Sequence, residues 1–134
     1  MKVVLDTNIL ISALGWNGNE RDILLESLSG ELDLLLSVDI TNEFLLVLSK
    51  DKFSNIQADK IARFIELILE TSVFVDTRSN AYAIKDDPQD NRILECALDG
   101  KADCMIACDK HLLNNGNYKR ISILKAREFL SIKR

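Results

Sequence analysis

Met1-Lys2-Val3-Val4-Leu5-Asp6-Thr7-Asn8 is the stretch that decides the fold. Its apolar, β-branched run ends at a carboxylate, and a second apolar run follows at once with Ile9. This pattern predicts a buried strand that passes directly into a helix, with Asp6 at the carboxyl end of the strand. Ligands bind at that edge of open parallel sheets, so Asp6 is a candidate for chemistry. A helix cap is the alternative interpretation, because Asp and Asn side chains accept hydrogen bonds from the first N–H groups of a helix.

The composition is typical of one globular domain. The chain has 134 residues, of which 47% are apolar, and we expect a single domain over 1–134. No apolar run approaches the roughly 20 residues that cross a bilayer, and the start lacks a signal peptide, so we expect a cytoplasmic protein without membrane contact. The three cysteines lack CxxC spacing and suit reduced thiols. A zinc site at Cys104, Cys108 and His111 is a weaker alternative, because structural zinc usually has four closely spaced ligands.

Charge is distributed unevenly along the chain. The net charge of −4 argues against nonspecific coating of nucleic acid. Residues 110–134 hold seven basic residues and one acidic residue, so this segment carries +6 and the rest of the chain −10. Such a basic segment can hold a phosphate backbone beside an acidic pocket, and Lys110, Lys119 and Arg120 are the candidates. A solvated terminal helix with basic residues near its C-terminus explains the segment equally well.

Apolar periodicity predicts strands and helices in alternation. Strands are expected at about 3–5, 34–36, 73–75, 104–108 and 121–123, and helices at about 21–28, 37–50, 57–70, 88–98, 111–113 and the end of the chain. Asp87-Pro88 should start one of these helices, with Asp87 as its cap. A glycine turn is expected before the last strand. The alternation predicts an α/β fold, an α/β/α sandwich around a mainly parallel sheet of four or five strands.

Four carboxylates occupy positions where a solvated surface is not expected. Asp90 shares a helix face with Ile93 and Leu94, and Glu43 shares one with core positions of its own helix. Asp109 follows an apolar strand, as Asp6 does. An unpaired buried carboxylate is costly, so each needs a cation, a hydrogen-bond network or a shifted pKa.

Divalent cations relieve the repulsion among clustered carboxylates, and oxygen ligands favour Mg²⁺ or Mn²⁺ over Zn²⁺. Such a site fits hydrolysis of a phosphodiester, because the metal can generate the nucleophile from water and stabilise the leaving oxygen. No serine, cysteine or histidine nucleophile is then needed. His111, the only histidine, is expected at the surface.

The arrangement resembles the PIN-domain nucleases over essentially the whole chain. The resemblance rests on Asp6-Thr7-Asn8, Glu43, Asp90-Asn91-Arg92-Ile93 and the strand leading to Asp109. It is strongest for the toxin-like PIN proteins related to VapC-type toxins. It implies a PIN-like α/β/α sandwich, Mg²⁺- or Mn²⁺-dependent cleavage of RNA, frequent homodimers and often a neutralising antitoxin. Asp6, Glu43, Asp90 and Asp109 match the catalytic, metal-binding acids, and Asn8 and Ser37 match polar residues that support them.

Two other classes of protein compete with this interpretation. A phosphate-transfer domain of the receiver or haloacid-dehalogenase type also places an Asp after its first strand, but the latter needs a second Asp where Asn8 stands. A non-catalytic PIN-like module that binds RNA or protein is the closer alternative. Ala107 favours it, because PIN nucleases usually have Thr or Ser two residues before the last acid.

Overall fold

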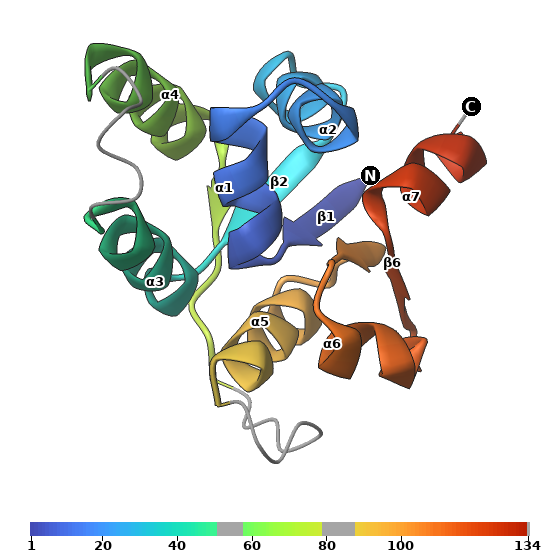
Figure 1. The fold of residues 1–134 in the computed structure, drawn as a ribbon. Coiled ribbons are helices and arrows are strands. Elements are labelled where there is room, and N and C mark those ends of the chain that lie inside the picture. Colours follow the sequence, from blue (N-terminus) through green and yellow to red (C-terminus); the bar gives the residue numbers. More distant parts are fainter. Residues whose placement is uncertain (51–57, 79–87, 134) are drawn as a thin grey trace.

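The computed structural model describes residues 1–50, 58–78 and 88–133, and its centre is a six-stranded sheet in the order β3-β2-β1-β4-β6-β5 (Figure 1). The strands are β1 (Lys2–Leu5), β2 (Asp33–Leu36), β3 (Val73–Phe74), β4 (Cys104–Ile106), β5 (Asn117–Tyr118) and β6 (Ile121–Leu124). The helices are α1 (Thr7–Gly15), α2 (Asn19–Leu28), α3 (Val38–Leu48), α4 (Ala58–Thr71), α5 (Pro88–Asp99), α6 (Lys110–Asn115) and α7 (Ala126–Lys133).

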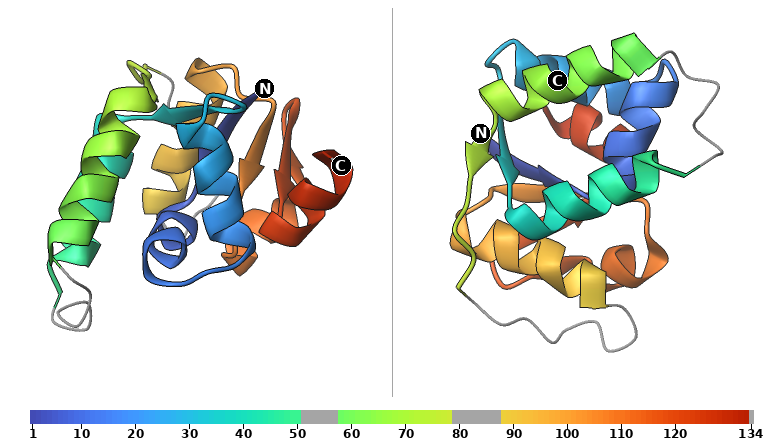
Figure 2. Two further views of the ribbon diagram at one scale, coloured as in Figure 1. Left: turned by 90° about the horizontal axis from the view of Figure 1, so that it is seen from above. Right: turned by 90° about the vertical axis from the view of Figure 1, so that its left-hand side faces the viewer.

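Helices cover both faces of this sheet. The helices α1 and α2 pack against each other on one side, and α5 lies on the other, where it contacts β1 and β2 (Figures 1 and 2). The predicted α/β fold with a mainly parallel sheet is therefore confirmed. No helix within the described ranges is long and apolar enough to cross a membrane.

The number of strands differs from the prediction of four or five. The additional strand is β5, which pairs antiparallel with β6 through Tyr118 and Ile121, where the sequence predicted only a turn. Two residues are too few to show any periodicity. The strand exists because the two-residue turn at Lys119 and Arg120 folds the chain back onto β6. Lys119 has a φ of 54°, a backbone conformation that glycine adopts more easily.

The opening strand forms as its sequence predicts. Val3, Val4 and Leu5 are at most 1% exposed, and β1 is paired in parallel on both sides, with β2 and with β4. A strand that is buried on both faces reads as a continuous apolar run, which is the pattern of this stretch. The chain then enters α1 directly, so the carboxyl edge of the sheet receives Asp6.

The helix α5 ends just before Gly100, where neighbouring side chains and the backbone leave no room for a Cβ. A Cβ on Gly100 would lie 2.7 Å from Leu35 Cδ1 and 2.9 Å from the carbonyl oxygen of Cys96, so only glycine fits there. The left-handed position that terminates the helix falls on the next residue, Lys101, with a φ of 56°. Ala102 N–H closes the cap by donating to the carbonyl of Ala97. The helix begins at Pro88 as predicted, whereas the expected cap, Asp87, lies outside the described residues.

Candidate metal centre

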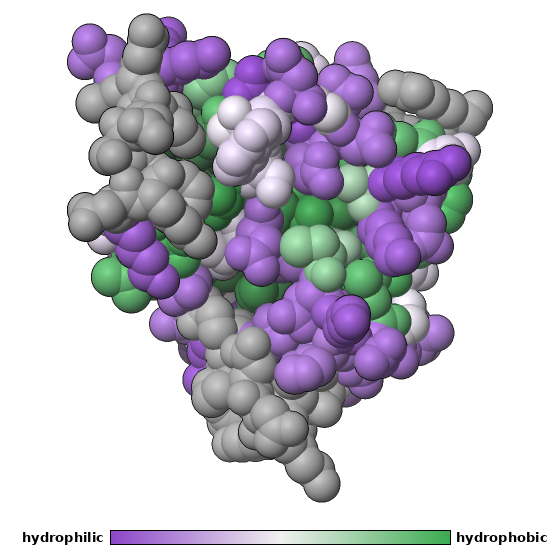
Figure 3. Space-filling view, in the orientation of Figure 1, coloured by the Kyte–Doolittle hydropathy of each residue, from purple (hydrophilic) through white to green (hydrophobic). Residues whose placement is uncertain are grey.

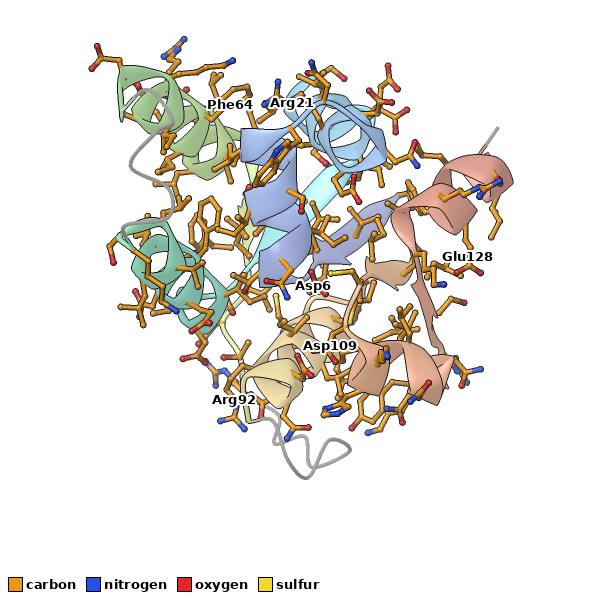
Figure 4. All side chains as sticks on the ribbon, viewed as in Figure 1. Asp6, Arg21, Phe64, Arg92, Asp109 and Glu128 are labelled. Atoms are coloured by element: carbon orange, nitrogen blue, oxygen red, sulfur yellow. The ribbon has the colours of Figure 1, made fainter. Side chains whose placement is uncertain are left out.

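All four predicted acids line one cavity of about 140 Å³ at the carboxyl edge of the sheet. They come from four places in the chain: the end of β1, α3, α5 and the loop after β4. The complete lining is Asp6, Thr7, Asn8, Glu43, Asp90, Ile93 and Asp109. Figure 4 shows Asp6 at the foot of α1 and Asp109 beside α5 and α6. On the same face, Figure 3 shows hydrophilic residues around a hollow where hydrophobic residues reach the surface.

Asp6 is held rigidly by the backbone around it. Its side chain is 3% exposed; Oδ1 accepts the N–H of Ile9 at 2.8 Å, and Oδ2 accepts the N–H of Cys108 at 3.0 Å. Asp6 therefore caps α1, as the alternative interpretation proposed, and also faces the cavity. Burial raises its pKa above 3.8, and the nearby charge of Asp109 adds to the increase, while the backbone hydrogen bonds oppose it. A carboxylate has about four acceptor sites, so two hydrogen bonds leave it able to bind a cation.

Asp109 is the corresponding cap of α6. Its Oδ1 accepts the N–H groups of His111 at 2.7 Å and Leu112 at 3.4 Å. Neither Asp109 nor Asp6 forms a salt bridge with a basic side chain among the described residues. Because only Oδ1 takes part in capping, the second oxygen of this half-buried carboxylate is available to the cavity.

Asp90 and Glu43 approach from two helices that contact each other. Asp90 is 5% exposed on the first turn of α5, on the face that buries Ile93 and Leu94 completely or nearly so. Glu43 is half-buried on α3, which packs against α5. Arg92, the basic residue closest to Asp90 in the chain, extends along α5 and pairs with Glu95 at 2.9 Å.

The two predicted supporting residues differ in position. Asn8 lines the cavity and is exposed at its mouth. Ser37 does not line it: its hydroxyl caps α3 by accepting the N–H of Ile40 at 3.2 Å. The side chain of Ser37 thus positions the helix that carries Glu43. Thr7, which the sequence did not single out, lines the cavity with a buried hydroxyl that has no hydrogen-bond partner in the described structure.

His111 lies at the surface, as the sequence predicts, and also close to two of the acids. It is exposed, as expected, but one imidazole nitrogen and single carboxylate oxygens of Asp90 and Asp109 lie within 4.8 Å of one another. The available signal was its position, two residues after the last acid. Within the described ranges, no group suited to a metal joins His111 to Cys104 or Cys108, which removes support for the zinc alternative.

The electrostatic character of the cavity also affects its neighbour Cys108. The pKa of this thiol is raised to about 11, first by burial and then by the negative charges of Asp6, Asp109 and Glu20. The negative charges of Asp6 and Asp109 therefore act together at this edge of the sheet, and a divalent cation can relieve their repulsion.

The predicted basic contacts lie at two different places. Lys110 follows Asp109 and is exposed at the carboxyl edge of the sheet. Lys119 and Arg120 precede β6 and therefore lie at the opposite, amino edge, where they line a separate cavity of about 420 Å³ together with Lys101.

Comparisons with known proteins bear on the fold and the family of the chain. A chain in the crystal structure of VapBC2 from Rickettsia felis bound to a DNA fragment from their promoter has the same fold. The TM-score is 0.62 and the identity 13%, with 92% of this chain and 97% of that chain covered. No curated protein matches the sequence. The family model described as "PIN domain" matches residues 2–111, which include the opening strand and all four acids. The chain therefore belongs to the PIN domain family.

Proposed function

We propose that this protein is a metal-dependent endoribonuclease that hydrolyses RNA phosphodiester bonds with Mg²⁺ or Mn²⁺. The observation that carries the proposal is the meeting of Asp6, Glu43, Asp90 and Asp109 in one cavity. Two of these side chains are at most 5% exposed, and burying charge at such cost is typical of functional sites.

The donor set fits a hard divalent cation. Four carboxylates offer only oxygen, and the cavity of about 140 Å³ has room for a cation with part of its water shell, as Mg²⁺ usually retains. The backbone N–H groups that hold Asp6 and Asp109 fix the orientation of both carboxylates, in the way that outer partners of metal ligands generally do.

The chemistry divides between the cation and the chain. When bound, a divalent cation supplies a lowered pKa for water and compensates negative charge on the reacting phosphate. We assign Asp6, Glu43, Asp90 and Asp109 the binding of that cation. We assign Asn8, which is exposed and lines the cavity, the predicted supporting role beside the acids, and its amide can donate hydrogen bonds to a phosphate oxygen of the substrate.

Cleavage of a mixed pool of structured and single-stranded RNA, with and without Mn²⁺, tests the proposal. Cleavage should require the metal and should be lost in Asp90→Asn. Asp59→Asn is the matched control, because Asp59 is exposed on the first turn of α4, away from the cavity. Equal cleavage by Asp90→Asn and the parent would remove Asp90 from the site.

Lys110, Lys119 and Arg120 are proposed to contact the RNA backbone. Each phosphate contact contributes about 0.7 to the dependence of log K on log salt for a single strand. Lys110→Ala should reduce this slope if the RNA follows the carboxyl edge past Asp109. Lys119→Ala and Arg120→Ala should reduce it only if the RNA also reaches the amino edge. An unchanged slope removes the mutated residue from the interface.

The likeness to a chain of a VapBC2 complex supports a further assignment, the toxin of a toxin–antitoxin pair that is neutralised by an antitoxin protein. Expression should then arrest growth, and the product of a neighbouring gene should relieve the arrest. We propose in addition that the chain forms a homodimer. Light scattering of the purified chain measures the dimer.

A non-catalytic RNA- or protein-binding module is the second candidate, favoured by Ala107. This residue is fully buried where the resemblance expects a hydroxyl. Metal-independent RNA binding without cleavage would favour this candidate over the nuclease.

A further inference from the structure

A nitrogen donor stands beside the acidic cavity. We propose that His111 is a metal ligand together with Asp90 and Asp109, and that this position therefore selects Mn²⁺ over Mg²⁺. The inference rests on the proposed function, because it takes metal binding by the two acids as given. Its own evidence is the position of the imidazole: one ring nitrogen and one oxygen from each carboxylate lie within 4.8 Å of one another.

These separations match the space around a single ion. Donors bind first-row divalent metals at roughly 2.0–2.2 Å, so donors on opposite sides of the ion are about 4 Å apart. The three donor atoms of Asp90, Asp109 and His111 lie within 4.8 Å of one another. A small rotation of one side chain is enough to bring them to the separation that an ion requires. His111 is free to make that rotation, because it is exposed and forms no salt bridge with any acid in the described structure.

The backbone keeps this histidine at the site. Its own N–H donates to Asp109 Oδ1 at 2.7 Å, and its carbonyl accepts from Asn115 Nδ2 at 3.0 Å. The ligand and the carboxylate beside it are thus tied to the same turn of α6, and ordering them around an ion costs less conformational entropy than joining independent segments.

The hydroxyl of Thr7 is a separate observation that favours a polar occupant of the cavity beside His111. Its hydroxyl belongs to a residue only 8% exposed, lines the cavity shared with Asp90 and Asp109, and has no hydrogen-bond partner among the described residues. Buried hydroxyls nearly always have a partner, so this one is expected to bond to the water shell of a bound ion.

The mixed donor set determines which ion is favoured. Mg²⁺ prefers an all-oxygen octahedron, whereas imidazole suits transition metals. A site of two carboxylates and one imidazole should therefore prefer Mn²⁺, and removing the imidazole should reduce that preference without abolishing binding by the acids.

Pulsed electron paramagnetic resonance of the Mn²⁺-loaded protein, prepared without a histidine tag, tests the assignment directly. Because the chain contains a single histidine, imidazole ¹⁴N coupling to Mn²⁺ can come only from His111. The coupling should be present in the parent and in the control Asn114→Ala, an exposed position on the same helix, and absent in His111→Gln. Calorimetry should show a larger loss of affinity for Mn²⁺ than for Mg²⁺ in His111→Gln, because imidazole suits transition metals.

Two results would overturn the inference, and they are distinguishable. Stoichiometric Mn²⁺ binding by the parent without imidazole coupling would remove His111 from the coordination sphere and leave the proposed function standing. No binding of Mn²⁺ or Mg²⁺ by the parent would overturn the inference and the metal-dependent function together.

Discussion

Replacing Asp109 with Asn separates the two roles that the structure gives this carboxylate. As a cap, Asp109 accepts the N–H groups of His111 and Leu112 through a single oxygen, Oδ1. As a charge, it raises the pKa of the buried Asp6. Asn retains an oxygen for the cap and removes the charge, whereas Ala removes both, so the pair Asp109→Asn and Asp109→Ala isolates each role.

The expected magnitudes follow from these contacts. Asn and Asp are equally good helix caps, so Asp109→Asn should leave the metal-free stability unchanged or slightly higher, because one negative charge near Asp6 is gone. Asp109→Ala should lower the free energy of unfolding by about 1 kcal/mol, because the helix cap is missing. For a chain of this size that loss lowers Tm by about 4 °C.

Thermal melts with and without Mn²⁺ provide the assay. Mn²⁺ at 100 times its Kd should stabilise the parent by about 2.7 kcal/mol. Both variants should lose most of this gain. A metal-free Asp109→Asn protein as unstable as Asp109→Ala would refute the capping argument, and full Mn²⁺ stabilisation of Asp109→Asn would refute its role as a ligand.

Three further predictions concern stability and pH. Gly100→Ala should destabilise the protein by about 1–3 kcal/mol in urea unfolding, because its Cβ would overlap Leu35 and the fixed carbonyl of Cys96; unchanged stability would mean that the backbone there yields easily. Lys101→Gly should raise Tm, since glycine relieves a φ of 56°, and a lowered Tm would show that the lysine side chain stabilises the fold. Because the pKa of Asp6 is raised, the native state binds a proton at this carboxylate more tightly than the unfolded state does. The contribution of Asp6 to the free energy of unfolding therefore decreases as pH rises through the pKa of the folded state. Because Mn²⁺ competes with that proton, calorimetry should show Mn²⁺ affinity decreasing as the pH is lowered from neutral towards 3.8, and an affinity that stays constant would contradict the assignment.

Asp90 illustrates what the spacing of residues along a helix can predict. Helical spacing alone placed it on the face of Ile93 and Leu94, and the structure buries all three side chains. The prediction succeeded because a helix fixes which residues share a face, whatever the helix packs against. The same reasoning located Asp6 at the end of a strand, since a buried parallel strand and its exit into a helix are both recorded in consecutive residues.

The positions of Ser37 and Lys119 relative to the cavity could not be predicted from the local sequence pattern. Ser37 was expected beside the acids, but its hydroxyl is occupied by the N–H of Ile40 at the start of α3. Lys119 was expected to contact an RNA backbone, which stays a prediction, and the turn before β6 places it at the opposite edge of the sheet from Asp6. Both outcomes depend on which end of an element faces the site, and that is decided by strand order and turn geometry.

The sequence by itself determined the α/β class, the positions of most helices and strands, and the identity of the four acids, because apolar periodicity and strand-end carboxylates are local signals. Only the tertiary structure decided that β5 pairs with β6, that Thr7 has a buried hydroxyl in the cavity, and that His111 stands beside Asp90 and Asp109. Those features join residues distant in the chain or depend on the exact direction of a short helix, and the free energy that fixes them comes from packing the whole sheet rather than from any one segment.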